Sequence, residues 1–165
     1  MILMTLRSRG IREIYVADTI ERRLQKAKEL GAKEIINVGD KDVVEAVNEL
    51  TGGKGTDLVY EVTGSKQATL QTVALAKKGG TITLIGLSSF ADLPFDINGF
   101  ICKELIAKSN FRYNHQYPVV LEALKEGQIE LDKVVSDVFK FEDIQKAMEH
   151  NTFNKPDVIK AVIEF

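Results

Sequence analysis

The chain has 165 residues, enough for one ordinary domain or for one domain with a small appendage. Hydrophobic residues make up 44% and charged residues 28%, the balance of a globular protein rather than of a disordered chain. The formal net charge is −2, and Lys and Arg are interleaved with Glu instead of forming a basic face. We therefore expect no nucleic acid partner.

Cysteine usage and hydropathy indicate a cytoplasmic protein. Cys102 is the only cysteine, so no intramolecular disulfide can form and a reducing compartment fits best. The apolar opening over residues 1–6 is too short for a signal-peptide core, and no basic segment precedes it. No stretch approaches the roughly 20 apolar residues that span a bilayer, so we expect no membrane partner.

Short β-branched runs alternate with amphipathic stretches, a pattern typical of a parallel sheet covered by helices. Helices are predicted, in chain order, over 1–9, 19–30, 41–50 (with Asp40 as a candidate cap), 65–78, 98–103 and 117–125. Strands are predicted over 11–17, 34–38, 57–62, 81–86 and 105–110. After Gly127 the rhythm changes to strand 134–141, helix 142–150 and strand 158–165, which indicates an appendage rather than another βα repeat.

The most informative local feature is Asp18, an acidic residue that closes an early strand. In dinucleotide-binding folds such an acid accepts hydrogen bonds from the adenosine ribose, and it repels a 2′-phosphate, which favours NAD over NADP. Arg23, five residues later, could contact the adenine or the ribose. Asp18 is equally well placed to cap the following helix, so the pattern alone leaves both roles open.

Two other cofactor signals are weak. The G-x-G-x-x-G turn that brings a pyrophosphate to a helix N-terminus is absent, and its strand and turn would precede Met1. Residues 52–56 (GGKGT) only superficially suggest a P-loop, because Asn48 stands where the first glycine is required. A glycine turn before a strand is the better interpretation.

The sequence predicts no metal site. A catalytic zinc needs about three protein ligands, whereas Cys102, His115 and His150 are scattered along the chain. We interpret Cys102 as a small packing residue and place His150 near a helix end. No nucleophile elbow is present either, so the sequence offers no catalytic residue of its own.

Several short sequence motifs, distributed over essentially the whole chain, occur together in a characteristic order. They are Ala17-Asp18 with Arg23, residues 27–32 (AKELGA), residues 57–64 ending in EVTG, residues 79–87 (GGTITLIGL), Phe111-Arg112-Tyr113 with Tyr117-Pro118, and residues 139–147. Together they resemble the zinc-type medium-chain alcohol dehydrogenases, and within them the sorbitol, xylitol and related polyol dehydrogenases. The resemblance implies an α/β, doubly wound, Rossmann-like parallel sheet whose first strand and glycine loop are missing, with a small C-terminal appendage.

The resemblance also implies roles by position. Asp18 and Arg23 would contact the adenosine ribose, and Thr63 and Gly64 would lie beneath the dinucleotide. Ile85, Gly86 and Leu87 would hold the nicotinamide carboxamide through their backbone. Phe111, Arg112 and Tyr113 would meet the nicotinamide end, with Arg112 and Tyr113 facing substrate. The competing interpretation of residues 111–113 is a strand end with a core aromatic and a surface arginine.

The departures from the family pattern define the rest of the hypothesis. Residues 1–126 would form an N-terminally truncated NAD-binding domain, and residues 127–165 would resemble the return into a catalytic domain that is missing, together with its zinc ligands. The intact enzyme of this family, of which this chain would be a part, would oxidise a secondary alcohol, such as a polyol, by hydride transfer to NAD. This chain alone is expected to be inactive and, with strand edges exposed, to form a homo-oligomer.

Two alternatives stay open. One is a relationship to the zinc-free medium-chain quinone reductases, against which residues 111–113 argue. The other is a catalytically inactive nucleotide-binding or oligomerisation module.

Overall fold

The computed structural model describes residues 1–93, 95–113, 115–154 and 156–165. They divide into two compact units, Met1–Asp40 with His115–Phe165, and Lys41–Asn114. Every strand pair among the described residues is parallel, as expected for an α/β chain. None of the helices that the structure describes is both long and apolar enough to cross a membrane.

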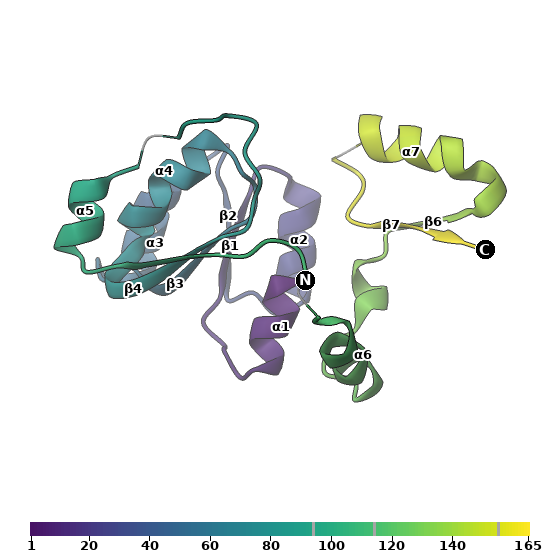
Figure 1. The fold of residues 1–165 in the computed structure, drawn as a ribbon, viewed down its shortest axis with the longest axis horizontal. Helices are drawn as coiled ribbons and strands as arrows, with labels where there is room; N and C mark the ends of the chain where they lie inside the picture. Colours follow the sequence, from purple (N-terminus) through teal and green to yellow (C-terminus); the bar gives the residue numbers. More distant parts are fainter. Residues whose placement is uncertain (94, 114, 155) are drawn as a thin grey trace. The chain divides into compact units, whose positions relative to one another are not determined.

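The first unit contains two separate two-stranded sheets (Figure 1). Its helices are α1 (Ile2–Ser8), α2 (Glu21–Glu29), α6 (Tyr117–Lys125) and α7 (Ile144–Phe153), with short 3-10 turns at Leu131–Val134 and Phe141–Asp143. Its strands are β1 (Tyr15–Asp18), β2 (Glu34–Asn37), β6 (Asp137–Lys140) and β7 (Ala161–Glu164). β1 pairs with β2, and β6 pairs with β7.

Apolar packing and one glycine turn fix the N-terminal part of this unit. Leu3, Ile14 and Ala27 form a buried cluster with Ala32, so α1 and α2 are joined through the same core. Gly31 ends α2 with a φ of 93°, a conformation in which a side chain is strained. The Gly31 carbonyl accepts a 2.9 Å hydrogen bond from the Arg7 guanidinium, which ties α1 to the end of α2.

The second unit is a three-stranded parallel sheet in the order β3-β4-β5 (Figure 1). Its elements are α3 (Val43–Thr51), β3 (Thr56–Glu61), α4 (Lys66–Leu75), β4 (Ala76–Leu84), α5 (Ile97–Cys102) and β5 (Ile106–Ser109). α4 packs on β3 and β4. Its buried core is centred on Val59, Val73 and Ile82, the last of which is fully inaccessible to solvent.

β4 begins directly where α4 ends, earlier than the sequence pattern predicts. The helix was expected to reach residue 78, but Ala76 is already extended and pairs with Thr56. A shift in register between Thr56 and Leu58 then lets the strand pass Gly79 and Gly80 before regular pairing resumes. The sequence alone does not show this irregular pairing, so its pattern extends the predicted helix to residue 78.

Lys103 explains how α4 can end so abruptly. Its ammonium donates three hydrogen bonds, to the carbonyls of Val73 (2.9 Å), Ala74 (3.0 Å) and Ala76 (2.8 Å). These carbonyls belong to the last turn of α4 and the residue after it, where the helix leaves acceptors without intrahelical donors. A positive charge at a helix C-terminus also interacts favourably with the helix dipole.

Three other expectations were wrong in detail. Asp42, not Asp40, caps α3, because its carboxylate accepts from the amides of Val44 (2.8 Å) and Glu45 (3.0 Å). The segment after Gly127 does contain a βαβ unit, since β6 and β7 are parallel with α7 between them. The strands predicted over 11–17 and 134–141 are shorter in the structure, where they begin at Tyr15 and Asp137.

We predict that Lys103→Met lowers the free energy of unfolding by about 1.5–3 kcal/mol, because it removes a charged donor from three carbonyls at once. Urea unfolding followed by circular dichroism measures the change. Lys78→Met, at an exposed position in β4, is the matched control. Equal stability losses in both variants would show that the Lys103 cap does not stabilise α4.

Candidate cofactor-binding site

The carboxyl ends of β3, β4 and β5 form one edge of the second unit's sheet. Glu61 pairs with Leu84, and Leu84 pairs with Ser109, so the three strands end in register. In open α/β sheets, ligands bind beyond the carboxyl ends of the strands. Eight of the ten predicted site residues follow these strand ends, at Thr63, Gly64, 85–87 and 111–113.

A buried carboxylate organises the first of these strand ends. Glu61 is only 5% exposed, and its Oε1 accepts hydrogen bonds from the Thr63 amide (2.8 Å) and the Thr63 hydroxyl (2.6 Å). It also accepts from the Gly64 amide, at 3.0 Å. The Thr63 hydroxyl in turn accepts from the Ser65 amide at 3.0 Å, and Ser65 caps α4. Glu61 therefore fixes the whole turn from β3 into α4.

The loops after β3 and β4 touch backbone to backbone. A Cβ placed on Gly86 would lie 2.1 Å from the Gly64 nitrogen, and one on Gly64 would lie 2.2 Å from the Leu87 carbonyl oxygen. Gly64 also has a φ of 68°, in the left-handed region. Both positions therefore require glycine, so the two glycines of the predicted site bring the loops together.

The β4 loop presents backbone groups at this edge. The amides of Ile85 (2.8 Å) and Gly86 (3.2 Å) both donate to the Glu61 carbonyl oxygen, which holds the loop against β3. Leu87 is 76% exposed, and within the described part of the chain its amide has no hydrogen-bond partner. A backbone amide without a partner inside the chain can donate to a ligand carbonyl.

The third loop is a tight turn after β5. The Asn110 amide donates to the Leu84 carbonyl oxygen (3.1 Å), and its side-chain amide donates to the Arg112 carbonyl oxygen (3.0 Å). Arg112 has a φ of 59°, and its guanidinium carbon lies 5.0 Å from the centroid of the Phe111 ring. Phe111 and Tyr113 are 65% and 55% exposed, so Phe111 is not the core aromatic of the competing interpretation.

Asp18 and Arg23 belong to the first unit. Asp18 is the last residue of β1, and its Oδ1 accepts a 3.0 Å hydrogen bond from the Ile20 amide. α2 begins at Glu21 with Ile20 as its N-cap, so Asp18 stabilises the turn before the helix and is not its cap. The Arg23 guanidinium donates a long, 3.4 Å hydrogen bond to the Val158 carbonyl oxygen.

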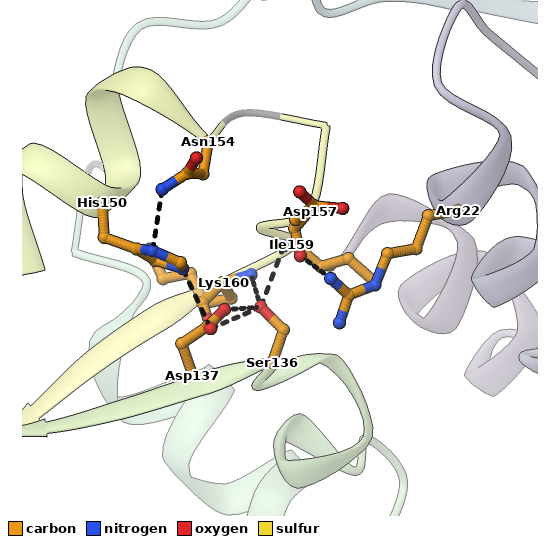
Figure 2. Close-up of polar contacts among 8 residues, drawn as sticks. All are labelled: Arg22, Ser136, Asp137, His150, Asn154, Asp157, Ile159 and Lys160. Carbon is orange, nitrogen blue, oxygen red and sulfur yellow. Dashed lines mark hydrogen bonds and ion pairs between the residues drawn. The ribbon is translucent and has the colours of Figure 1, made fainter.

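A second polar cluster lies in the C-terminal part of the first unit (Figure 2). Ser136 donates to Asp137 (2.5 Å), Asp137 contacts Nε2 of His150 (3.1 Å), and Nδ1 of His150 contacts the Asn154 side-chain amide (3.0 Å). Because Asn154 can donate to Nδ1, the neutral imidazole carries its proton on Nε2 and donates it to Asp137. The sequence places His150 near a helix end but does not predict this network; Asn154, four residues later, is the C-cap of α7.

This cluster does not have the order of a nucleophilic triad. In such a triad the imidazole contacts the hydroxyl, whereas here the carboxylate lies between them. The Ser136 hydroxyl also accepts from the amides of Ile159 (2.9 Å) and Lys160 (3.2 Å). The network therefore joins β6, α7 and the segment before β7, and its role is structural.

The described residues contain no group of three or more His, Cys, Asp or Glu side chains placed to hold a metal ion. Cys102 is exposed rather than packed, contrary to our interpretation of it as a packing residue. A three-ligand zinc site of the kind that dehydrogenases use does not fit this part of the chain.

Comparison with known proteins decides the family. The sequence profile of the zinc-binding dehydrogenases matches residues 1–126. The chain belongs to this family. A zinc-type alcohol dehydrogenase-like protein, YdjJ of Escherichia coli K12, is 34% identical over 99% of this chain and 47% of its own length. The sorbitol dehydrogenase of Bacillus subtilis is 30% identical over 93% of this chain and 44% of its own length.

Solved dehydrogenase structures share the fold. An E. coli oxidoreductase of unknown specificity superimposes with a TM-score of 0.92 at 32% identity, over 99% of this chain and 46% of that structure. An E. coli CFT073 alcohol dehydrogenase (rspB), solved with NADH, gives a TM-score of 0.92 at 27% identity, over 99% of this chain and 48% of its own. The predicted family and α/β fold class are confirmed. The chain spans about half the length of the curated relatives it matches.

Glu61 is the residue of this edge to which the sequence analysis gave no role. The available signal was an acidic residue at the end of a β-branched strand, three positions before a glycine. That pattern does not show burial, and charged residues are rarely buried unless they are paired. The hydrogen bonds that compensate the burial of the Glu61 carboxylate come from the turn at Thr63 and Gly64, whose geometry only the structure shows.

The close contact at Gly64 gives a direct test of the loop packing. We predict that Gly64→Ala lowers the free energy of unfolding by about 1–3 kcal/mol more than Gly52→Ala does. Gly52 has a similar φ of 60° but open space around its Cβ position, so the difference isolates the clash with Leu87. Chemical denaturation of both variants measures it. Equal losses would show that the loops do not pack as described.

The C-terminal network gives a pH-dependent prediction. Hydrogen bonds from Ser136 and then from His150, together with the charge of Arg22, hold the pKa of Asp137 below its ordinary value. A carboxylate whose pKa is lowered on folding contributes stability above its unfolded pKa, and that contribution is lost as the pH falls through the folded pKa. The difference in Tm between the unchanged chain and Asp137→Asn should therefore be full above about pH 5 and shrink toward pH 2.

Thermal unfolding over this pH range measures the effect. Asp132→Asn, an exposed change in the same segment, corrects for the altered net charge. A Tm difference for Asp137→Asn that stays constant from neutral to acidic pH would contradict the assignment.

Proposed function

We propose that this chain provides the NAD-binding part of an NAD-dependent zinc-type alcohol or polyol dehydrogenase, which oxidises a secondary alcohol to a ketone. The observation that carries the proposal is Asp18, whose carboxylate ends β1 and is oriented by the Ile20 amide. Membership of the zinc-binding dehydrogenases supports it, as does the NADH bound to one solved relative. The polyol substrate is suggested by relatives named sorbitol dehydrogenase and D-xylulose reductase.

Asp18 would recognise the adenosine ribose. Its Oδ1 is engaged by the Ile20 amide, and no ion pair neutralises the carboxylate within the described ranges. A carboxylate accepts hydrogen bonds from both ribose hydroxyls and repels a 2′-phosphate, so the chain should prefer NAD to NADP. Arg23 would reach the ribose or the adenine only by giving up its long contact with Val158.

The loops of the second unit would contact the nicotinamide end. The Leu87 amide can donate to the carboxamide oxygen, and the Thr63–Gly64 turn can lie beneath the dinucleotide without a side chain at Gly64. Phe111 offers an exposed apolar surface, and Arg112 and Tyr113 would face substrate. When bound, NAD accepts a hydride from the alcohol carbon. The chain's own residues would bind and orient it.

Zinc chemistry does not follow from the described residues, because none of their side-chain groups forms a three-ligand set. We therefore expect the chain by itself to show no polyol turnover with NAD and added zinc, and a spectrophotometric assay of NADH formation checks this. An alternative function is an inactive nucleotide-binding or oligomerisation module. It is favoured by the strand edges, because β1 and β3 each have one strand neighbour among the described residues and copies of the chain could pair there.

Calorimetric titration tests cofactor binding. We predict that the unchanged chain binds NAD more tightly than NADP and that Asp18→Ala weakens NAD binding by about ten- to a hundredfold, since charge-assisted hydrogen bonds are worth about 1.5–3 kcal/mol. Asp40→Ala, an exposed change in the same unit, is the control. Absence of NAD binding by the unchanged chain, or equal affinity in both variants, would refute the proposed role of Asp18.

A further inference from the structure

We propose that Glu61 is a positioning residue for the nicotinamide half of the cofactor, an inference that rests on the proposed function. Glu61 has no assigned role in binding, yet it contacts both loops that would meet the nicotinamide. Its side chain holds the turn at Thr63 and Gly64, and its backbone carbonyl holds Ile85 and Gly86. One residue therefore fixes two loops relative to each other.

The local geometry shows why a carboxylate occupies this position. Three donors, the Thr63 amide, the Thr63 hydroxyl and the Gly64 amide, converge on Oε1 within 3.0 Å. An ionised carboxylate offers about four lone-pair positions over its two oxygens, and the Gly64 amide also lies 3.2 Å from Oε2, so all three donors can be satisfied. The ion pairs formed by the described residues do not include Glu61, so hydrogen bonds alone compensate its burial.

The contact is also stereochemically demanding. With glycine at positions 64 and 86, the two loops approach so closely that an added Cβ would fall 2.1–2.2 Å from backbone atoms of the other loop. A small rotation of the Thr63–Gly64 turn therefore displaces Gly86 and Leu87 as well. Removing the acceptor at Glu61 frees that rotation, which moves the Leu87 amide away from its ligand.

The position of Glu61 predicts a selective effect on binding. ADP-ribose contains the adenosine and pyrophosphate of NAD but lacks the nicotinamide. Loss of Glu61 should weaken NAD binding by about tenfold, the factor expected when buried donors lose an acceptor, and leave ADP-ribose binding unchanged. A general loss of stability would instead weaken the binding of both ligands.

Three variants distinguish a positioning role of the Glu61 side chain from an effect of its charge and from a general loss of stability of the second unit. Glu61→Ala removes the acceptor. Glu61→Gln keeps a carbonyl oxygen at Oε1 for the converging donors but loses the acceptor at Oε2, which lies 3.2 Å from the Gly64 nitrogen, so we expect an NAD affinity between those of the unchanged chain and Glu61→Ala. Lys103→Met destabilises the same unit through the end of α4 and should leave the ratio of NAD to ADP-ribose affinity unchanged.

The experiment is calorimetric titration of the full chain and the three variants with NAD and with ADP-ribose, after circular dichroism has shown that each is folded. If Glu61→Ala does not fold, Glu61→Gln is compared with the unchanged chain instead, and it should weaken only NAD binding. The inference is overturned if Glu61→Ala binds NAD normally, if it weakens both ligands equally, or if Glu61→Gln is as weak as Glu61→Ala.

Failure of the proposed function gives a different result. In that case the unchanged chain binds neither ligand, and the role of Glu61 in binding falls with it. If the unchanged chain binds both NAD and ADP-ribose but Glu61→Ala does not weaken NAD binding selectively, the proposed function survives and the positioning role does not.

Discussion

The close backbone contact between the loops after β3 and β4 is the constraint on which the candidate site depends. Gly64 and Gly86 allow an approach that no side chain could tolerate, and the Glu61 carboxylate and carbonyl hold both loops in place. Hydrogen bonds in such a buried setting are individually modest but expensive to leave unmade. The arrangement therefore turns the end of an ordinary parallel sheet into a rigid edge at which backbone groups are available to a ligand.

The two units contribute different chemistry to the proposed function. The first unit carries Asp18, an acid oriented by the turn before α2. The second carries the Leu87 amide, which has no hydrogen-bond partner among the described residues, and the exposed Phe111 ring. Neither contribution is redox chemistry, which the cofactor would supply. Within the described ranges no side-chain cluster fits a metal ion, and the chain matches about half the length of its relatives. The role that we propose for these residues is to bind and orient the cofactor.

Hydrophobic periodicity predicts most of the helices and strands. Two of the errors lie at helix ends, where contacts that the sequence pattern does not show decide the boundary. Tyr117–Lys125 was predicted to the residue, because its apolar spacing is regular and Gly127 follows it. The end of α4 was predicted three residues late, since Lys103, distant in sequence, supplies the cap. The α3 cap was assigned to Asp40 instead of Asp42, because two acidic residues precede the helix and only the backbone geometry distinguishes them.

The candidate site was predictable from the sequence only as a set of positions. Asp18 and the glycines could be identified by type and order, but the burial of Glu61 and the exposure of Phe111 depend on how loops fold over the strand ends. The most direct test of the account is an NMR titration of the isotopically labelled chain with NAD. We predict that the amide signals of Thr63, Gly64 and Leu87 shift together with one dissociation constant as NAD is added. Shifts confined to other residues, or no shifts at all, would contradict it.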